Sequence, residues 1–186
     1  MKFSKTEQQF LLDLARKSIS HFLKNRTILK IDKEKLPSKK LKEKLATFVT
    51  LTKNGNLRGC IGHLTAIQPL YLDIIENAKS AAVDDFRFLE VTLAELDLIK
   101  IEISILSKPE KLEYNSLEEL FEKLKNKPGV ILSKGQAQAT FLPQVWEELD
   151  KPSEFLSHLA EKAGLGHNEW KNAEYKVYYV ENFQEQ

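Results

Sequence analysis

The hydrophobic positions of the chain follow two periods, one typical of helices and one typical of strands. Residues 4–23 have the helical period, with an apolar stripe formed by Phe10, Leu11, Leu14, Ile19 and Phe22. Ser4 or Thr6 is suited to cap this helix, because a hydroxyl accepts a hydrogen bond from the free N–H groups of the first turn. Gln8 or Gln9 follows at about the spacing of a capping box. The pattern therefore predicts an amphipathic helix.

Strict alternation of apolar and polar residues predicts strands elsewhere. Residues 99–106 alternate most clearly, and one face of this strand would carry Ile99, Ile101, Ile103 and Ile105. Residues 47–53 and 56–61 flank Asn54-Gly55, a pair that favours the type I′ turn of a β-hairpin. Gly59 and Gly62 interrupt the second of these strands, which indicates a bulge or a close backbone approach.

Turn and cap residues mark the remaining elements. We expect helices over residues 69–82, 116–124 and 152–164, and a short helix from Pro143 that contains Trp146. A second hairpin is expected over residues 129–132 and 137–142, and a last strand over residues 175–180. Residues 25–40 are polar and linker-like, with a short helix near 39–45. Together these elements predict one α+β domain over residues 1–186, with mostly antiparallel sheet and flanking helices.

The composition limits the class of protein. The chain has 186 residues, 42% of them hydrophobic, and its 28 basic and 27 acidic residues leave a net charge of +1. A balanced charge makes nucleic acid an unlikely partner. The single cysteine, the absence of a signal-peptide pattern and the lack of a long apolar run favour a cytoplasmic protein with no membrane span. No glycine-rich nucleotide motif or GxSxG elbow occurs, so no cofactor is implied.

Cys60 is the most promising reactive side chain. Arg58 lies two residues earlier, so on a strand the two could share a face, and a guanidinium would favour the thiolate. Gly59 and Gly62 would let a ligand approach the backbone and its N–H groups. The alternative is a packed thiol in a bulged strand, which these residues alone favour. His63 could act as the base for the thiol, although a histidine beside a turn is more often solvated or a cap.

Two other segments carry polar candidates. Asp84, Asp85 and Arg87 follow the helix over residues 69–82, and the two carboxylates could hold a cation or orient Arg87. A helix-ending ion pair between Asp85 and Arg87 is the simpler interpretation. Thr140 and Gln144 lie where a strand meets a helix that starts with proline, and such a helix end offers N–H groups to an anion. Cys60 and His63 alone are too few ligands for a structural zinc site, so we expect no metal.

The segment Leu57-Arg58-Gly59-Cys60-Ile61-Gly62 resembles the signature of the AMMECR family, the A component of the AmmeMemoRadiSam system. Further matching segments lie at residues 69–70, 81–82, 85–88, 101–107, 129–132, 140–146 and 162–165. The resemblance implies an α+β fold with one larger and one smaller lobe, and no settled activity. It also implies partners, a Memo-like protein and a radical-SAM protein, with an unknown small-molecule or macromolecular ligand.

Two departures from the family pattern bear on the site. Phe86 replaces the usual proline between Asp85 and Arg87, and Gln138 stands where a basic residue is common. Our leading hypothesis is an enzyme or enzyme accessory in which Cys60 is the nucleophile or redox thiol and Arg58 an anion clamp. In this hypothesis Asp85, Arg87 and Gln144 lie around the same pocket. The alternative is a non-catalytic module whose motif binds a protein or RNA, and a third interpretation makes the motif purely structural.

Overall fold

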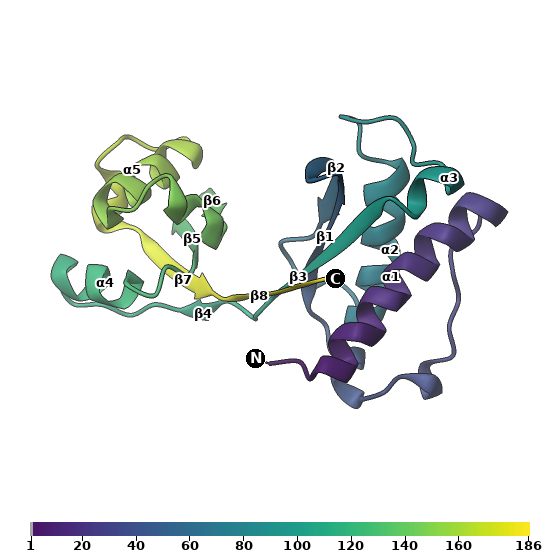
Figure 1. Ribbon diagram of the computed structural model, residues 1–186. Coiled ribbons are helices and arrows are strands. Elements are labelled where there is room, and N and C mark those ends of the chain that lie inside the picture. The colour runs from purple at the N-terminus through teal and green to yellow at the C-terminus, as the bar shows by residue number, and fades with distance from the viewer. Residues whose placement is uncertain (1) are drawn as a thin grey trace. The chain divides into compact units, whose positions relative to one another are not determined.

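The structure, a computed structural model, describes residues 2–186 and divides into two compact units (Figure 1). The first unit comprises residues up to 107 together with 181–186, and the second comprises residues 108–180. Each contains a four-stranded sheet, with strand orders β2-β1-β3-β8 and β4-β7-β5-β6. The recorded strand pairs are antiparallel, so the predicted α+β class with mostly antiparallel sheet and two unequal lobes is confirmed.

The first unit places two helices on one face of its sheet. Figure 1 shows α1 and α2 side by side on that face. Its elements are α1 (Lys5–Asn25), the 3₁₀ turns Lys33–Lys35 and Lys39–Lys42, β1 (Ala46–Lys53), β2 (Asn56–Gly62), α2 (Leu70–Val83), α3 (Leu93–Leu96), β3 (Ile99–Leu106) and β8 (Val180–Gln184). The four predicted isoleucines of β3 are all buried in the core between sheet and helices.

The first helix forms where its apolar stripe predicts it, with Ser4 as the N-cap. Its capping-box partner is Glu7, whose carboxylate accepts the Ser4 N–H at 2.8 Å. The expectation that Gln8 or Gln9 fills this position was wrong, because the box needs the third residue after the cap. Arg26 ends the helix in the left-handed conformation, with φ of 55°.

The β1–β2 hairpin is confirmed, with Asn54 at φ 52° and Gly55 at φ 80° in its turn. Leu51 lies opposite Gly59, whereas the next residue, Thr52, lies opposite Leu57. Arg58 is therefore the extra residue of a bulge. The glycine-interrupted strand thus contains the irregularity that the sequence indicated.

The second unit is built around Trp146, which stacks on Phe155 at 3.7 Å between ring centroids. The indole Nε1 donates to the carbonyl of Pro128 at 2.7 Å, which satisfies its one polar group inside the core. The elements of this unit are β4 (Glu110–Lys111), α4 (Leu117–Leu124), β5 (Gly129–Lys134), β6 (Ala137–Phe141), the 3₁₀ turn Pro143–Glu147, α5 (Pro152–Lys162), the 3₁₀ turn Glu169–Asn172 and β7 (Glu174–Tyr178).

The predicted last strand is two strands. β7 ends at Tyr178 and pairs with β5, whereas β8 begins at Val180 and belongs to the sheet of the first unit. Periodicity alone predicted a single strand here, because it does not reveal which sheet a segment joins. The elements α3 and β4 were not predicted, since each is too short to show a period.

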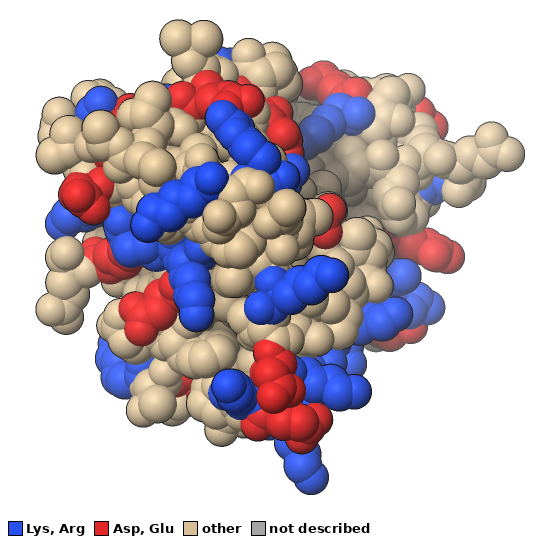
Figure 2. Space-filling view, turned by 90° about the vertical axis from the view of Figure 1, so that its right-hand side faces the viewer, with Lys and Arg blue, Asp and Glu red and all other residues tan. Residues whose placement is uncertain are grey.

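Charged side chains of both signs are interspersed over the face of the molecule that Figure 2 shows, in keeping with the balanced composition. Within residues 2–186, no helix is long and apolar enough to cross a membrane.

Gly59→Ala should destabilise the chain by about 1–3 kcal/mol, because overpacking forces backbone shifts. A Cβ at this position would lie 2.0 Å from the carbonyl oxygen of Ala81 in α2. Gly166→Ala is the matched control, since its Cβ would meet its nearest neighbour at an ordinary 3.5 Å. Thermal unfolding followed by circular dichroism checks both; equal melting temperatures would show that α2 and β2 are not in close contact.

Candidate functional site

Cys60 lies on β2, the edge strand of the first sheet. Its strand partner is Thr50, whose hydroxyl donates to the Cys60 sulfur at 3.3 Å. Val49 and Leu51, which flank Thr50 in β1, are fully buried in the core that the sheet shares with the helices. Because side chains alternate along a strand, Thr50 and Cys60 point to the opposite face of the sheet. The thiol is partly exposed there.

The outer edge of β2 at Cys60 is bound by two side chains. The Cys60 N–H donates to Asp85 Oδ2 at 2.8 Å, and Arg87 Nη2 donates to the Cys60 carbonyl at 3.3 Å. The side chains of Asp85 and Arg87 also pair with each other through two hydrogen bonds, of 2.9 and 2.7 Å, and the Arg87 N–H donates to Asp85 Oδ1 at 3.2 Å. The structure thus brings together three of the predicted site residues, and Phe86 in place of proline does not prevent the pair. We call the Asp85 and Arg87 side chains, together with their bonds to the Cys60 backbone, the edge clamp.

The electrostatics of the edge clamp favour its charged form. The Asp85 side chain is only 3% exposed, and burial by itself would raise the pKa of this carboxyl. The hydrogen bonds from Arg87 outweigh burial and hold the Asp85 pKa far below its ordinary range. The same hydrogen bonds raise the pKa of Arg87, whose side chain remains 44% exposed. The clamp therefore presents a guanidinium to solvent next to the Cys60 backbone.

Arg58 is tied to the segment that follows α2. Its Nε and Nη2 donate to the two carboxylate oxygens of Glu95 at 2.8 and 3.0 Å. Nη1 donates to the Leu89 carbonyl at 2.8 Å and Nη2 to the Glu90 carbonyl at 3.3 Å. With the side chain only 16% exposed, this guanidinium is committed to the protein. The geometry favours a structural tie for Arg58 over the anion clamp expected from the sequence.

The two motif glycines allow the protein to pack closely on itself. A Cβ on Gly59 would collide with the Ala81 carbonyl, and one on Gly62 would lie 2.4 Å from the ring of Phe48. Both positions are thus filled by α2 and by a neighbouring strand. A ligand is not needed to explain either glycine.

His63 forms a second polar cluster with residues of β1 and α2. Its Nδ1 lies 2.7 Å from Oδ1 of Asp73, which is fully buried. The other oxygen of Asp73 accepts the Thr47 N–H at 3.0 Å, the Thr47 hydroxyl at 2.6 Å and Asn77 Nδ2 at 3.0 Å. Gln68 Nε2 adds a further bond to Oδ1 at 3.2 Å. We call this group the His63 cluster.

The His63 cluster lies on the helix-covered side of the sheet, whereas the Cys60 thiol points to the other side. His63 follows Gly59 and Ile61 in the alternation of β2, and Ile61 packs against the core. The structure therefore pairs His63 with Asp73 and not with Cys60. Sequence reasoning missed Asp73 and Asn77, although both lie at helical spacing on the stripe of α2 that turns inward.

Thr140 and Gln144 belong to the second unit. The Thr140 hydroxyl donates to the Val130 carbonyl at 2.9 Å and lies 3.0 Å from the hydroxyl of Tyr178. Lys162 Nζ donates to the Thr140 carbonyl at 3.0 Å. Gln144 is exposed in the 3₁₀ turn that starts at Pro143. Thr140 is thus held by residues of its own sheet, whereas Gln144 is exposed to solvent.

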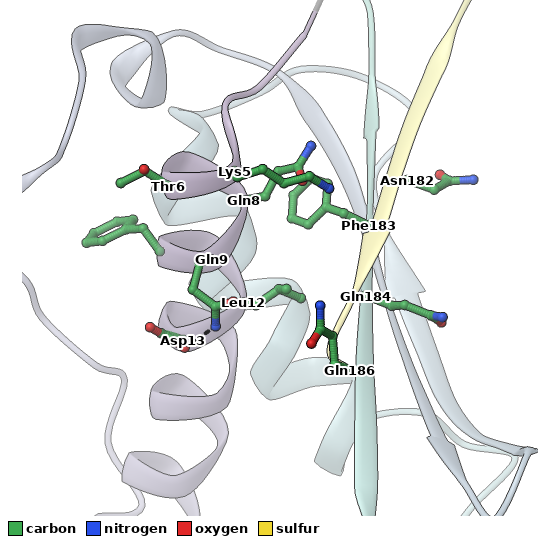
Figure 3. Close-up of a pocket in the computed structure, with 11 residues that line it drawn as sticks. Lys5, Thr6, Gln8, Gln9, Leu12, Asp13, Asn182, Phe183, Gln184 and Gln186 are labelled. Atoms are coloured by element: carbon green, nitrogen blue, oxygen red, sulfur yellow. Dashed lines mark hydrogen bonds between the residues drawn. The ribbon is translucent and has the colours of Figure 1, made fainter.

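A groove in the first unit lies apart from the predicted site residues. Figure 3 shows it between the start of α1 and β8, and none of the motif residues lines it. Its lining is mainly amide and charged: Lys5, Thr6, Gln8, Gln9, Phe10, Leu12, Asp13, Asn182, Phe183, Gln184 and Gln186. Within residues 2–186, no group of three or more histidine, cysteine or acidic residues is arranged to hold a metal ion.

Glu95→Gln should remove a part of the stability that depends on pH. Hydrogen bonds from Arg58 lower the pKa of Glu95 from its ordinary 4.5 to about 2. A lowered pKa stabilises the fold fully above pH 4.5, and this contribution is lost as the pH falls through about 2. The wild-type chain should exceed the variant in urea unfolding free energy at pH 7, with a difference that shrinks toward pH 2.

Glu34→Gln is the control for this experiment, because the Glu34 side chain is 71% exposed and its ion pair with Lys42 is long, at 3.5 Å. It should change stability little at any pH. A Glu95→Gln effect that stays constant from pH 2 to pH 7 would contradict the ionised Arg58–Glu95 pair.

Comparison with known proteins identifies the family. The AMMECR1 family model matches residues 12–183. A protein of Methanopyrus kandleri is 40% identical over 97% of this chain and 88% of its own length, and one of Thermofilum pendens is 38% identical over 95% and 88%. The crystal structure of an uncharacterised protein from Pyrococcus horikoshii superposes with a TM-score of 0.80 at 36% identity, covering 100% of this chain and 95% of that one. The chain therefore belongs to the AMMECR1 family.

Proposed function

We propose that the chain is an enzyme, or an accessory to one, whose reactive group is the partly exposed Cys60 thiol on the face of the first sheet that the helices do not cover. The observation that supports this is the hydrogen bond from the Thr50 hydroxyl to the Cys60 sulfur. A hydroxyl that donates to sulfur stabilises the thiolate more than the neutral thiol, because hydrogen bonds to charged groups are the stronger ones. The thiolate is the form that attacks an electrophile.

The edge clamp adds two properties that a nucleophile needs. It fixes the backbone of Cys60 at both its N–H and its carbonyl, so the strand that bears the thiol is held in place before a substrate arrives. It also places the half-exposed guanidinium of Arg87 beside the thiol-bearing residue, where it could bind an anionic group of a substrate. In this proposal Arg87 makes the anion contact, and Arg58 and Glu95 position the strand.

Thr50→Val should slow alkylation of Cys60 by iodoacetamide at pH 7 by roughly five- to thirtyfold, since it removes a charge-stabilising hydrogen bond of about 1–2 kcal/mol. The chain has one cysteine, so mass spectrometry of the intact protein measures this site alone. Thr52→Val is the matched control, two residues along the same face of β1. Equal rates for wild type and Thr50→Val, or a thiol that reacts only after unfolding, would sink the nucleophile.

A second candidate function rests on two exposed apolar side chains. Phe86 and Leu89 are 95% and 87% exposed, although their loop is held by the edge clamp and by the Arg58 bond to the Leu89 carbonyl. A fixed loop that presents large apolar groups to solvent is typical of a protein-binding surface. We propose the Memo-like or radical-SAM protein of the same system as the partner that covers it.

The double variant Phe86→Ser/Leu89→Ser should weaken binding to that partner at least tenfold without lowering the melting temperature, because hot-spot side chains contribute about 2 kcal/mol or more. Isothermal titration calorimetry with the purified Memo-like and radical-SAM proteins measures the affinity. Leu72→Ser, at a 37% exposed position on α2, is the control. Unchanged affinity for both proteins would rule out this loop as the contact.

A further inference from the structure

A cavity in the first unit lies between α1 and the segment that links α1 to β1. Its volume is about 460 Å³, within the roughly 300–1,000 Å³ of small-molecule sites. One face of α1 lines it through Phe10, Asp13, Leu14 and Lys17, and the linking segment contributes four residues from the range 30–35. The cavity shares no residue with the edge clamp or with the His63 cluster, so neither accounts for it.

The cavity has an apolar surface. Leu14 belongs to a small buried cluster with Leu29 and Ile75, and Phe10 and Ile31 pack against this cluster. The linking segment is therefore attached to α1 by hydrophobic contacts, although its composition is polar. The partly buried side chains of Phe10 and Ile31 also line the cavity, so they offer hydrocarbon surface to the body of a ligand.

Three lysines line the same cavity. Lys17 comes from α1, and Lys30 and Lys35 come from the linking segment; all three are exposed. Within residues 2–186, no hydrogen bond or ion pair is recorded for any of their three ammonium groups. Each ammonium has three N–H donors and a full positive charge. The cavity thus combines an apolar surface with three cations that no protein group engages.

The two aspartates of the cavity do not neutralise these lysines. Asp13 Oδ1 accepts a hydrogen bond from Gln9 Nε2 at 2.9 Å, and Asp32 Oδ1 accepts one from the N–H of Glu34 at 3.0 Å. Both donors are neutral. Three lysines against two aspartates leave one positive charge in excess among the lining residues, which favours an anionic ligand.

We propose that this cavity binds a phosphate monoester of a small aromatic alcohol. The ring lies against Phe10, Leu14 and Ile31, where it is removed from water and contacts the phenylalanine ring. The phosphate carries nearly two negative charges at neutral pH and three terminal oxygens. Three ammonium groups match this group better than they match the single charge of a carboxylate.

Isothermal titration calorimetry of the full chain at pH 7.5 tests both halves of the ligand. 1-Naphthyl phosphate should bind at least tenfold more tightly than methyl phosphate, which lacks the ring, and than 1-naphthol, which lacks the charge. 1-Naphthoate should bind more weakly than 1-naphthyl phosphate. The proposal is overturned if 1-naphthyl phosphate shows no saturable binding at millimolar concentrations, or if any of the other three ligands binds as tightly.

A charge-removing variant locates the binding at this cavity. Lys17→Gln/Lys35→Gln should weaken the binding of 1-naphthyl phosphate at least tenfold, because it removes two charged donors, and should leave the melting temperature unchanged. Lys33→Gln/Lys39→Gln is the matched control: it removes the same charge at two exposed positions outside the cavity, and Lys33 belongs to the same 3₁₀ turn as Lys35. An equal loss of affinity in the control variant would show unspecific attraction of an anion, which contradicts the site.

Discussion

The edge clamp is the interaction on which the organisation of the motif depends. An edge strand leaves backbone N–H and carbonyl groups without a neighbouring strand, and such an edge attracts other chains. At Cys60 the Asp85 carboxylate accepts the N–H and the Arg87 guanidinium donates to the carbonyl, as a neighbouring strand would do. Two further hydrogen bonds join the side chains of Asp85 and Arg87 to each other. Together these bonds attach the segment after α2 to β2 at the residue that bears the thiol.

A second tie reinforces this attachment. Arg58, the extra residue of the bulge, binds Glu95 and two carbonyls of the same segment. Because Arg58 is the extra residue of the bulge, its side chain does not have to follow the regular alternation of side chains along β2. Gly59, between the two ties, allows α2 to approach the strand as closely as its backbone permits. The motif thus fixes a loop to a strand, and the proposed chemistry of Cys60 makes use of that rigidity.

The alternation of β2 separates the Cys60 thiol from the His63 ring. Cys60 and Thr50 point to the face of the sheet opposite the helices, whereas His63 reaches the helix-covered side and meets the buried carboxylate of Asp73. A thiol and a histidine three residues apart would suit a nucleophile and its base, but a strand sends odd-numbered and even-numbered neighbours to opposite faces. The similar proteins of the AMMECR1 family carry no activity in their names, so the geometry of this chain is the basis of the proposals.

The sequence by itself determined the elements and the family. Periodicity located the helix with Ser4 at its cap, the isoleucine strand and both hairpins, because burial on one face repeats every two or 3.6 residues. The motif and its companion segments indicated the family, and Asp85 and Arg87 were expected near Cys60. Only the tertiary structure decided that Arg58 binds Glu95, that His63 binds Asp73, and that the last strand divides between two sheets. These contacts join residues distant in sequence, and a local pattern specifies which face a side chain takes but not which element lies against it.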